Sequence, residues 1–154
     1  MDLDKFLNAA LVPRQAEVDV PELAGVLFGA DEKPVWVVRG LTSNEIAHAN
    51  AAGERSDSLK ALVTAMAGEG DKAAAIRGAM GLTDGEVHPS VSRGIELLTA
   101  GSVSPALGQD KRDVAVKLAE GYPALFYRLT RKIDELSGLG AELGKRKRSG
   151  ATPA

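Results

Sequence analysis

The chain contains no cysteine, and this absence excludes disulfide frameworks, thiolate metal sites and thiol nucleophiles. Aromatic residues make up only 4% of the composition, so a core has to be built mainly from Leu, Val and Ala. No run of about 18 apolar residues occurs, and the N-terminus opens with acidic residues instead of a basic region before an apolar stretch. We therefore expect a cytoplasmic chain without an export signal or membrane span.

The residues that are present favour one folded domain with a short tail. An apolar fraction of 44% and a charged fraction of 26% are close to globular averages, and 154 residues leave room for a single core. We expect one globular domain over residues 1–142 and a basic disordered tail over 143–154, because this tail has nothing to bury.

The basic residues near the C-terminus separate the tail from an acidic body. Lys145, Arg146, Lys147 and Arg148 are consecutive, and without them 15 basic residues (19 minus 4) face 21 acidic ones, a formal charge of -6. Phosphate affinity grows with the number of cations engaged together, so nucleic acid is not an expected partner. The four residues form either a solubilising tail or a small nucleic-acid contact.

The N-terminal segment has the spacing of an amphipathic helix. Leu3, Phe6, Leu7, Ala10 and Leu11 fall on one helical face, which predicts a helix over residues 2–11 that stops before Pro13.

Two later segments alternate as strands do. Residues 16–20 carry Val18 and Val20 on one face, and residues 35–39 carry Trp36 and Val38 on one face. We predict that the two segments pair antiparallel, with the first at an edge or an end because Pro21 follows it. Two strands alone are marginal, so the hairpin must pack on helices. The expected fold class is α+β, mainly α, with an N-terminal β-hairpin packed on a bundle of short helices.

The stretch VWVVRGLTSNEIAHANAA leads from the second strand into an alanine-rich segment. Thr42 fits a helix N-cap, Glu45 completes a capping box, and Leu41 and Ile46 are placed for a hydrophobic staple. A catalytic loop at Arg39 to Thr42 is the alternative. We favour a strand-to-helix junction, because each residue of the turn has a local structural task.

The remaining pattern is helical with glycine breaks. We predict one helix that ends near Gly53, a second through residues 59–66, a short third from Asp71, and a turn at 82–87.

A further helix is predicted from Pro89 to about Ala100, followed by a loop through GSVSPALGQ. Asp110 is the predicted cap of a long helical region that Gly138 ends. Pro123 falls inside this region and predicts either a kink or two abutting helices.

The inventory of reactive groups does not support catalysis. His48 and His88 are the only histidines, and they have no metal-ligand spacing. AGEGDKAAA lacks the order of a phosphate-binding loop, and no acidic pair is singled out as an acid and base. We expect a non-enzymatic protein with no catalytic, metal-binding or cofactor-binding residues.

Two apolar faces are candidates for partner contact, although core packing is the default reading of such faces. If either face is exposed, it would accept an amphipathic helix from a partner. The candidate residues are Leu3, Phe6, Leu7, Tyr122, Phe126 and Leu129.

Three stretches together resemble the tail assembly chaperones of long-tailed bacteriophages. They are DLDKFLNAA leading into EVDVPEL, VWVVRGLTSNEIAHANAA, and YPALFYRLTRKIDELSGLG, and they span most of residues 2–140 in the order of that family. The resemblance implies a small, mainly helical protein that binds the tape-measure protein, keeps it soluble and helps to bring tail-tube subunits to it. Self-association is also expected, as is location in the host cell cytoplasm and not in the finished virion.

Two other functions are compatible with the residues, namely a small structural connector of the tail and a nucleic-acid-binding regulator that uses the basic tail. The resemblance also implies a longer product made by ribosomal frameshifting, and the Gly144–Lys145 junction suits such an arrangement. The absence of a slippery heptamer and an overlapping frame in the gene would end that hypothesis.

Overall fold

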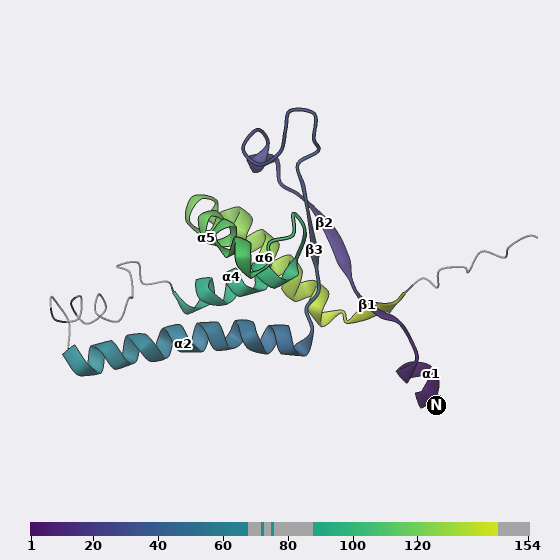
Figure 1. Ribbon diagram of the computed structural model, residues 1–154, viewed down its shortest axis with the longest axis horizontal. Coiled ribbons are helices and arrows are strands. Elements are labelled where there is room, and N and C mark those ends of the chain that lie inside the picture. Colours follow the sequence, from purple (N-terminus) through teal and green to yellow (C-terminus); the bar gives the residue numbers. More distant parts are fainter. Residues whose placement is uncertain (68–71, 73–74, 76–87, 145–154) are drawn as a thin grey trace, which may run out of the picture.

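The computed structural model describes residues 1–67, 72, 75 and 88–144 (Figure 1). Its helices are α1 (Leu3–Leu7), α2 (Ser43–Ala67), α4 (Pro89–Gly101), α5 (Arg112–Gly121) and α6 (Pro123–Gly138), with 3-10 turns η1 (Pro21–Leu23) and η2 (Gln109–Lys111). Its strands are β1 (Leu11–Pro13), β2 (Gln15–Asp19), β3 (Val35–Arg39), β4 (Ser102–Ser104) and β5 (Ala141–Leu143). The predicted α+β, mainly α class is confirmed.

The predicted hairpin is present as two strands of a three-stranded antiparallel sheet in the order β2-β3-β4. Gln15 pairs with Arg39 and Asp19 with Val35, so the predicted pairing and the edge position of the first strand are confirmed. Trp36 and Val38 share one face, as the alternation predicts, and both are fully buried. Strand β4 was predicted as loop. A strand of three residues, Ser-Val-Ser, is too short for its alternation to be recognised, and its place is set by tertiary contacts such as the hydrogen bond from Trp36 Nε1 to Ser102 Oγ at 3.0 Å.

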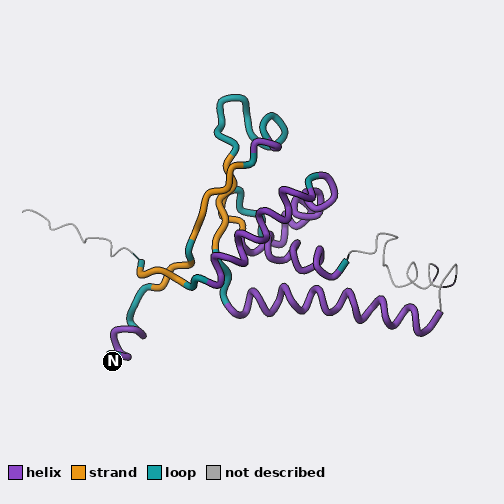
Figure 2. The backbone as a smooth tube through the Cα atoms, turned by 180° about the vertical axis from the view of Figure 1, so that it is seen from behind, coloured by secondary structure: helices purple, strands orange, loops and turns teal. Residues whose placement is uncertain are grey.

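The helices other than α1 lie on one side of the sheet, as both views show (Figures 1 and 2). Helix α4 is central, because it packs against α2, α5 and α6. The largest fully buried side chains come from the sheet, α2, α4, α6 and the residue after β2. They are Trp36, Phe126, Leu97, Leu98, Leu125, Leu129, Ile133, Val20, Val38 and Val63.

The predicted strand-to-helix junction has the expected capping geometry. Thr42 N donates to Glu45 Oε2 at 2.8 Å, and Glu45 N donates to Thr42 Oγ1 at 3.4 Å. Leu41 is buried and Ile46 packs against the same core. Arg39 adds a contact that the capping pattern did not predict, since its guanidinium binds both carboxylate oxygens of Glu45 at 2.6 and 3.1 Å.

The predicted helix break at Gly53 is wrong, because α2 runs unbroken from Ser43 to Ala67. A Cβ at Gly53 would lie 3.0 Å from the backbone oxygen of Pro89, so this glycine is where α2 approaches the start of α4. Glycine usually destabilises a helix interior by about 1 kcal/mol, which is why the sequence suggested a break. Here the close approach of two helices accounts for it.

The predictions for the C-terminal half are largely confirmed. Helix α4 begins at Pro89, α6 ends at Gly138, and Pro123 separates two abutting helices instead of kinking one. The predicted cap at Asp110 is wrong. Asp110 lies within η2, and the N-cap position of α5 is Lys111, which makes no side-chain capping hydrogen bond.

The two ends of the described chain meet in a way the sequence did not predict. The helix predicted over residues 2–11 ends at Leu7, and Leu11 belongs to β1, which pairs antiparallel with β5. Leu143, predicted as the start of the tail, pairs with Leu11. We call α1 with the β1–β5 ribbon, residues 1–13 and 139–144, the terminal arm. The predicted tail beyond Gly144 lies outside the described residues. So do the short helix predicted from Asp71, apart from Lys72 and Ala75, and the turn predicted at 82–87.

Candidate functional site

The predicted partner residues of the C-terminal half belong to the core. Phe126 is 1% exposed and Leu129 is 0% exposed, while Tyr122 is half-buried against the same cluster. Helix α6 turns its apolar stripe toward α4, so that a Cβ at Gly94 would lie only 2.6 Å from the Phe126 ring. The assignment of Phe126 and Leu129 to partner contact is therefore corrected, because the fold of this chain already covers them.

The predicted partner residues of the N-terminal helix are exposed. Leu3, Phe6 and Leu7 have exposed fractions of 64%, 63% and 77%, and α1 has no buried residue. The helix is capped by a neighbouring residue, because Asp2 Oδ1 accepts a hydrogen bond from Lys5 N at 2.9 Å. A single amphipathic turn therefore presents its apolar side to solvent.

The rest of the terminal arm extends this apolar surface. Leu11, Val12, Leu139 and Leu143 are also exposed, and they come from both ends of the described chain. The ribbon that joins them is fixed by main-chain pairing and by an ion pair between Arg14 and Glu142, 128 residues apart. Several exposed apolar side chains on one small structural unit are candidates for a protein contact site. The arm is therefore our main candidate for a functional surface.

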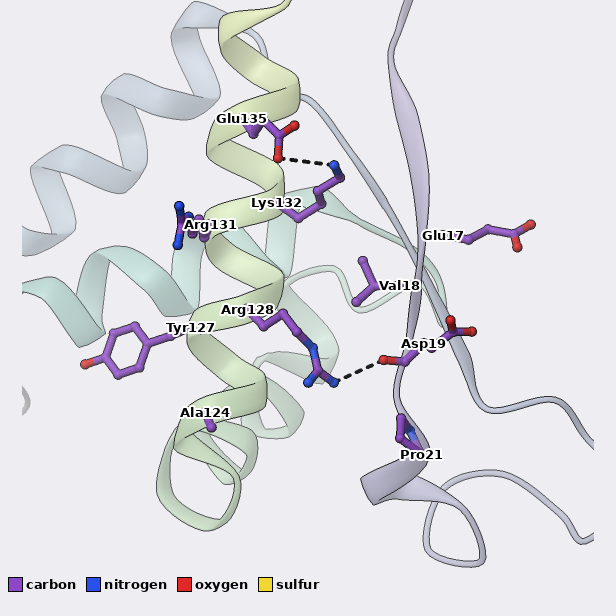
Figure 3. Close-up of a pocket in the computed structure, with 10 residues that line it drawn as sticks. All are labelled: Glu17, Val18, Asp19, Pro21, Ala124, Tyr127, Arg128, Arg131, Lys132 and Glu135. Atoms are coloured by element: carbon purple, nitrogen blue, oxygen red, sulfur yellow. Dashed lines mark hydrogen bonds and ion pairs between the residues drawn. The ribbon is translucent and has the colours of Figure 1, made fainter.

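A second candidate is an open groove of about 800 Å³ between β2 and α6 (Figure 3). Its apolar lining includes Val18, Ala124 and Tyr127. Tyr127 is 52% exposed, although its neighbour Phe126 is core. No part of the sequence analysis pointed to this groove, because it forms where an edge strand lies beside a helix more than 100 residues later.

The charged lining of the groove is partly neutralised from within the chain. Arg128 bridges α6 to the N-terminal region, since it binds Glu22 at 3.0 Å and donates to the backbone oxygen of Asp19 at 3.0 Å. This ion pair lowers the pKa of Glu22. Lys132 binds Glu135 at 3.1 Å on the same helix. The hydrogen bond from Arg128 to Asp19 O holds the end of β2 beside α6 (Figure 3).

Among the described residues, Glu96 on α4 is the most buried ionisable group, and it stabilises the packing of the helices. Burial raises its pKa, but hydrogen bonds from Arg112 and Gln109 outweigh burial and lower the pKa below its usual value. Arg112 Nε lies 2.9 Å from the carboxylate, and His48 Nδ1 on α2 lies 3.7 Å away. The cluster ties α4 to α2 and to the start of α5.

The other histidine also has a local partner, because His88 Nδ1 accepts a hydrogen bond from Ser90 N at 3.3 Å and caps α4. Within the described ranges, no group of three His, Asp or Glu side chains is arranged to hold a metal ion. Of the helices formed by described residues, none has the length and apolarity to cross a membrane.

The terminal arm and the groove are thus surfaces suited to protein contacts. Lys145, Arg146, Lys147 and Arg148, the predicted nucleic-acid or frameshift-junction tail, lie outside the described part of the chain. Comparisons of the chain with models of known families, with curated proteins and with solved structures gave no match.

Proposed function

We propose that this chain is a non-enzymatic tail assembly chaperone, which binds the tape-measure protein, keeps it soluble and helps to recruit tail-tube subunits in the host cytoplasm. The observation that carries the proposal is the exposed apolar surface of the terminal arm, added to the order of the three resembling stretches. Leu3, Phe6 and Leu7 are more than 60% exposed, so their apolar side chains are accessible to a client protein.

The chemistry of the arm suits a long helical client. An amphipathic client helix carries a stripe of apolar side chains that promote aggregation when exposed, and apolar surface on a partner shields such a stripe. Contact through apolar side chains depends little on salt, whereas contact through exposed charges weakens as salt is added. Salt dependence therefore separates the proposed contact from an electrostatic one.

The test is co-expression of the chain with the tape-measure protein from the same gene neighbourhood. We expect the chain to increase the soluble fraction of the client and to co-purify with it at both low and high salt. The variant Phe6→Asp should abolish both effects. The control is Leu62→Asp, because Leu62 on α2 is also an exposed apolar residue, 48% against 63% for Phe6, and lies outside the arm.

Three results would contradict the proposal. An unchanged soluble fraction of the client would overturn it for this product. Recovery of the chain in purified particles would favour a structural connector, and salt-sensitive binding lost on deletion of Lys145–Arg148 would favour a nucleic-acid-binding regulator.

A further inference from the structure

One chain offers both an uncovered helix and an open groove. Helix α1 presents Leu3, Phe6 and Leu7 to solvent, and the groove between β2 and α6 leaves about 800 Å³ open beside exposed apolar side chains. We propose that the groove takes helix α1 of a second copy of this chain.

The charges of the two surfaces match. Among the cations that line the groove, Arg128 binds Glu22 and Lys132 binds Glu135, whereas exposed Arg131 has no ion-pair or hydrogen-bond partner within the described part of the chain. Helix α1 carries Asp4, an exposed acid without a salt-bridge partner in the described ranges. An Asp4–Arg131 pair would orient the helix in the groove.

The acidic side chains that line the groove do not pair with Arg131, which therefore remains accessible to Asp4 of a second copy. Asp19 lies 3.8 Å from Lys33, and Glu135 is already paired with Lys132. Glu17 points away from α6 in Figure 3. The apolar wall of Val18, Ala124 and Tyr127 supplies the surface that would cover Leu3, Phe6 and Leu7.

The path of the chain favours a neighbour's groove over its own. Pairing of β1 with β5 and the hydrogen bond from Gly144 N to Ala10 O at 2.7 Å fix the base of the arm beyond the end of α6. From that base, α1 projects away from the helices in both views (Figures 1 and 2). The arm is thus presented outward, where a second copy can receive it.

The contact joins two different surfaces, arm on one copy and groove on the next. Such a heterologous contact leaves one free arm and one free groove at the ends of each assembly, so copies add until a ring closes or a chain extends. The inference concerns the chain in the absence of any client. It does not depend on the proposed chaperone function.

The first measurement is sedimentation velocity of the purified full chain over a range of concentrations. We expect species larger than a monomer whose population grows with concentration. Phe6→Asp on the arm and Tyr127→Asp in the groove should each weaken self-association at least about tenfold, because each places a charge in the apolar contact. Leu62→Asp is the matched control and should assemble as the unchanged chain does. Circular dichroism melting confirms that each variant is folded.

Mixing the two defective variants gives the decisive result. A Phe6→Asp copy keeps its groove and a Tyr127→Asp copy keeps its arm, so an equimolar mixture should form a 1:1 dimer and stop there. The charge swap Asp4→Lys with Arg131→Glu should restore assembly that Arg131→Glu alone weakens. A monomer at every concentration, or assembly unaffected by Phe6→Asp, would overturn the proposal. A mixture that stays monomeric would also overturn it.

Discussion

The helical body and the terminal arm use the same kinds of residue at the same spacing but differ in what covers them. Phe126 and Leu129 on α6 are buried, while Phe6 and Leu3 on α1 are more than 60% exposed. Helix α6 spans 16 residues and lies against α4 and the sheet, whereas α1 spans five residues and has no buried side chain. Helical spacing thus indicates an apolar face, and only the position of the helix in the fold decides whether this face is core or surface.

The largest expected effect on stability comes from truncating Phe126, the buried aromatic residue of α6. Phe126→Ala should lower the free energy of unfolding by about 3–5 kcal/mol, because it removes packed atoms and leaves a cavity. Urea denaturation followed by circular dichroism measures the change. A loss below about 1 kcal/mol would show that α6 is not packed as described.

A smaller loss of stability is expected from adding a methyl group where α4 packs closely on α6. Gly94→Ala on α4 would place a Cβ 2.6 Å from the Phe126 ring, so the ring or the helix must shift. Overpacking of this kind costs about 1–3 kcal/mol, which should appear as a lower melting temperature in calorimetry. Gly138→Ala is the matched control, because nothing lies within 4 Å of a Cβ at that glycine. Equal melting temperatures for the two variants would contradict the close packing of α4 on α6.

The junction between sheet and helices should make stability depend on pH. Hydrogen bonds from Arg39 lower the pKa of Glu45 from 4.5 to about 2. The folded state therefore binds this proton less readily than the unfolded chain does. The resulting stabilisation is present above about pH 4.5 and is lost as the pH falls toward about 2. The carboxylate is partly exposed and screened, so we expect about 1–2 kcal/mol.

Denaturation at about pH 5 and at about pH 2.5 measures this dependence. Glu45→Gln should be less stable than the unchanged chain at the higher pH and should approach it at the lower pH. Glu17→Gln, on the exposed face of β2, serves as control and should track the unchanged chain at both values. A constant difference between Glu45→Gln and the unchanged chain would argue against the Arg39–Glu45 pair.

The smallest effect is expected in the arm. At a concentration low enough for the chain to be monomeric, Phe6→Ala should change the free energy of unfolding by no more than about 0.5 kcal/mol, because a 63% exposed side chain contributes little to the fold. The same urea titration as for Phe126→Ala provides the comparison. A loss of 2 kcal/mol or more, on the order of a core truncation, would mean that the arm packs on its own body.

Capping, proline and alternation patterns predicted the structure correctly where residues close together along the chain determine it. Thr42 and Glu45 predicted the start of α2, Pro89 the start of α4, and Pro123 the boundary between α5 and α6. The alternation around Trp36 predicted the strand and the division of its side chains between two faces. Each of these features depends on residues that lie within a few positions of one another.

Except for the local cap predicted at Asp110, the failures share a physical cause, which is contact between distant segments. Gly53 was interpreted as a helix break because its role, a close approach to the start of α4 at Pro89, depends on a segment 36 residues later in the chain. The groove could not be predicted, since it requires β2 to lie beside α6. Partner contact was predicted for two stripes alike, and only the fold separated Phe126 from Phe6.

The sequence by itself determined the α+β, mainly helical class, the β2–β3 hairpin and the junction into α2, because capping and alternation act over a few residues. The tertiary structure alone decided that β1 pairs with β5, that α2 approaches the start of α4 at Gly53, and which apolar stripe remains exposed. These outcomes depend on which segments meet in space, and side-chain spacing along one segment carries no information about the segment that covers it.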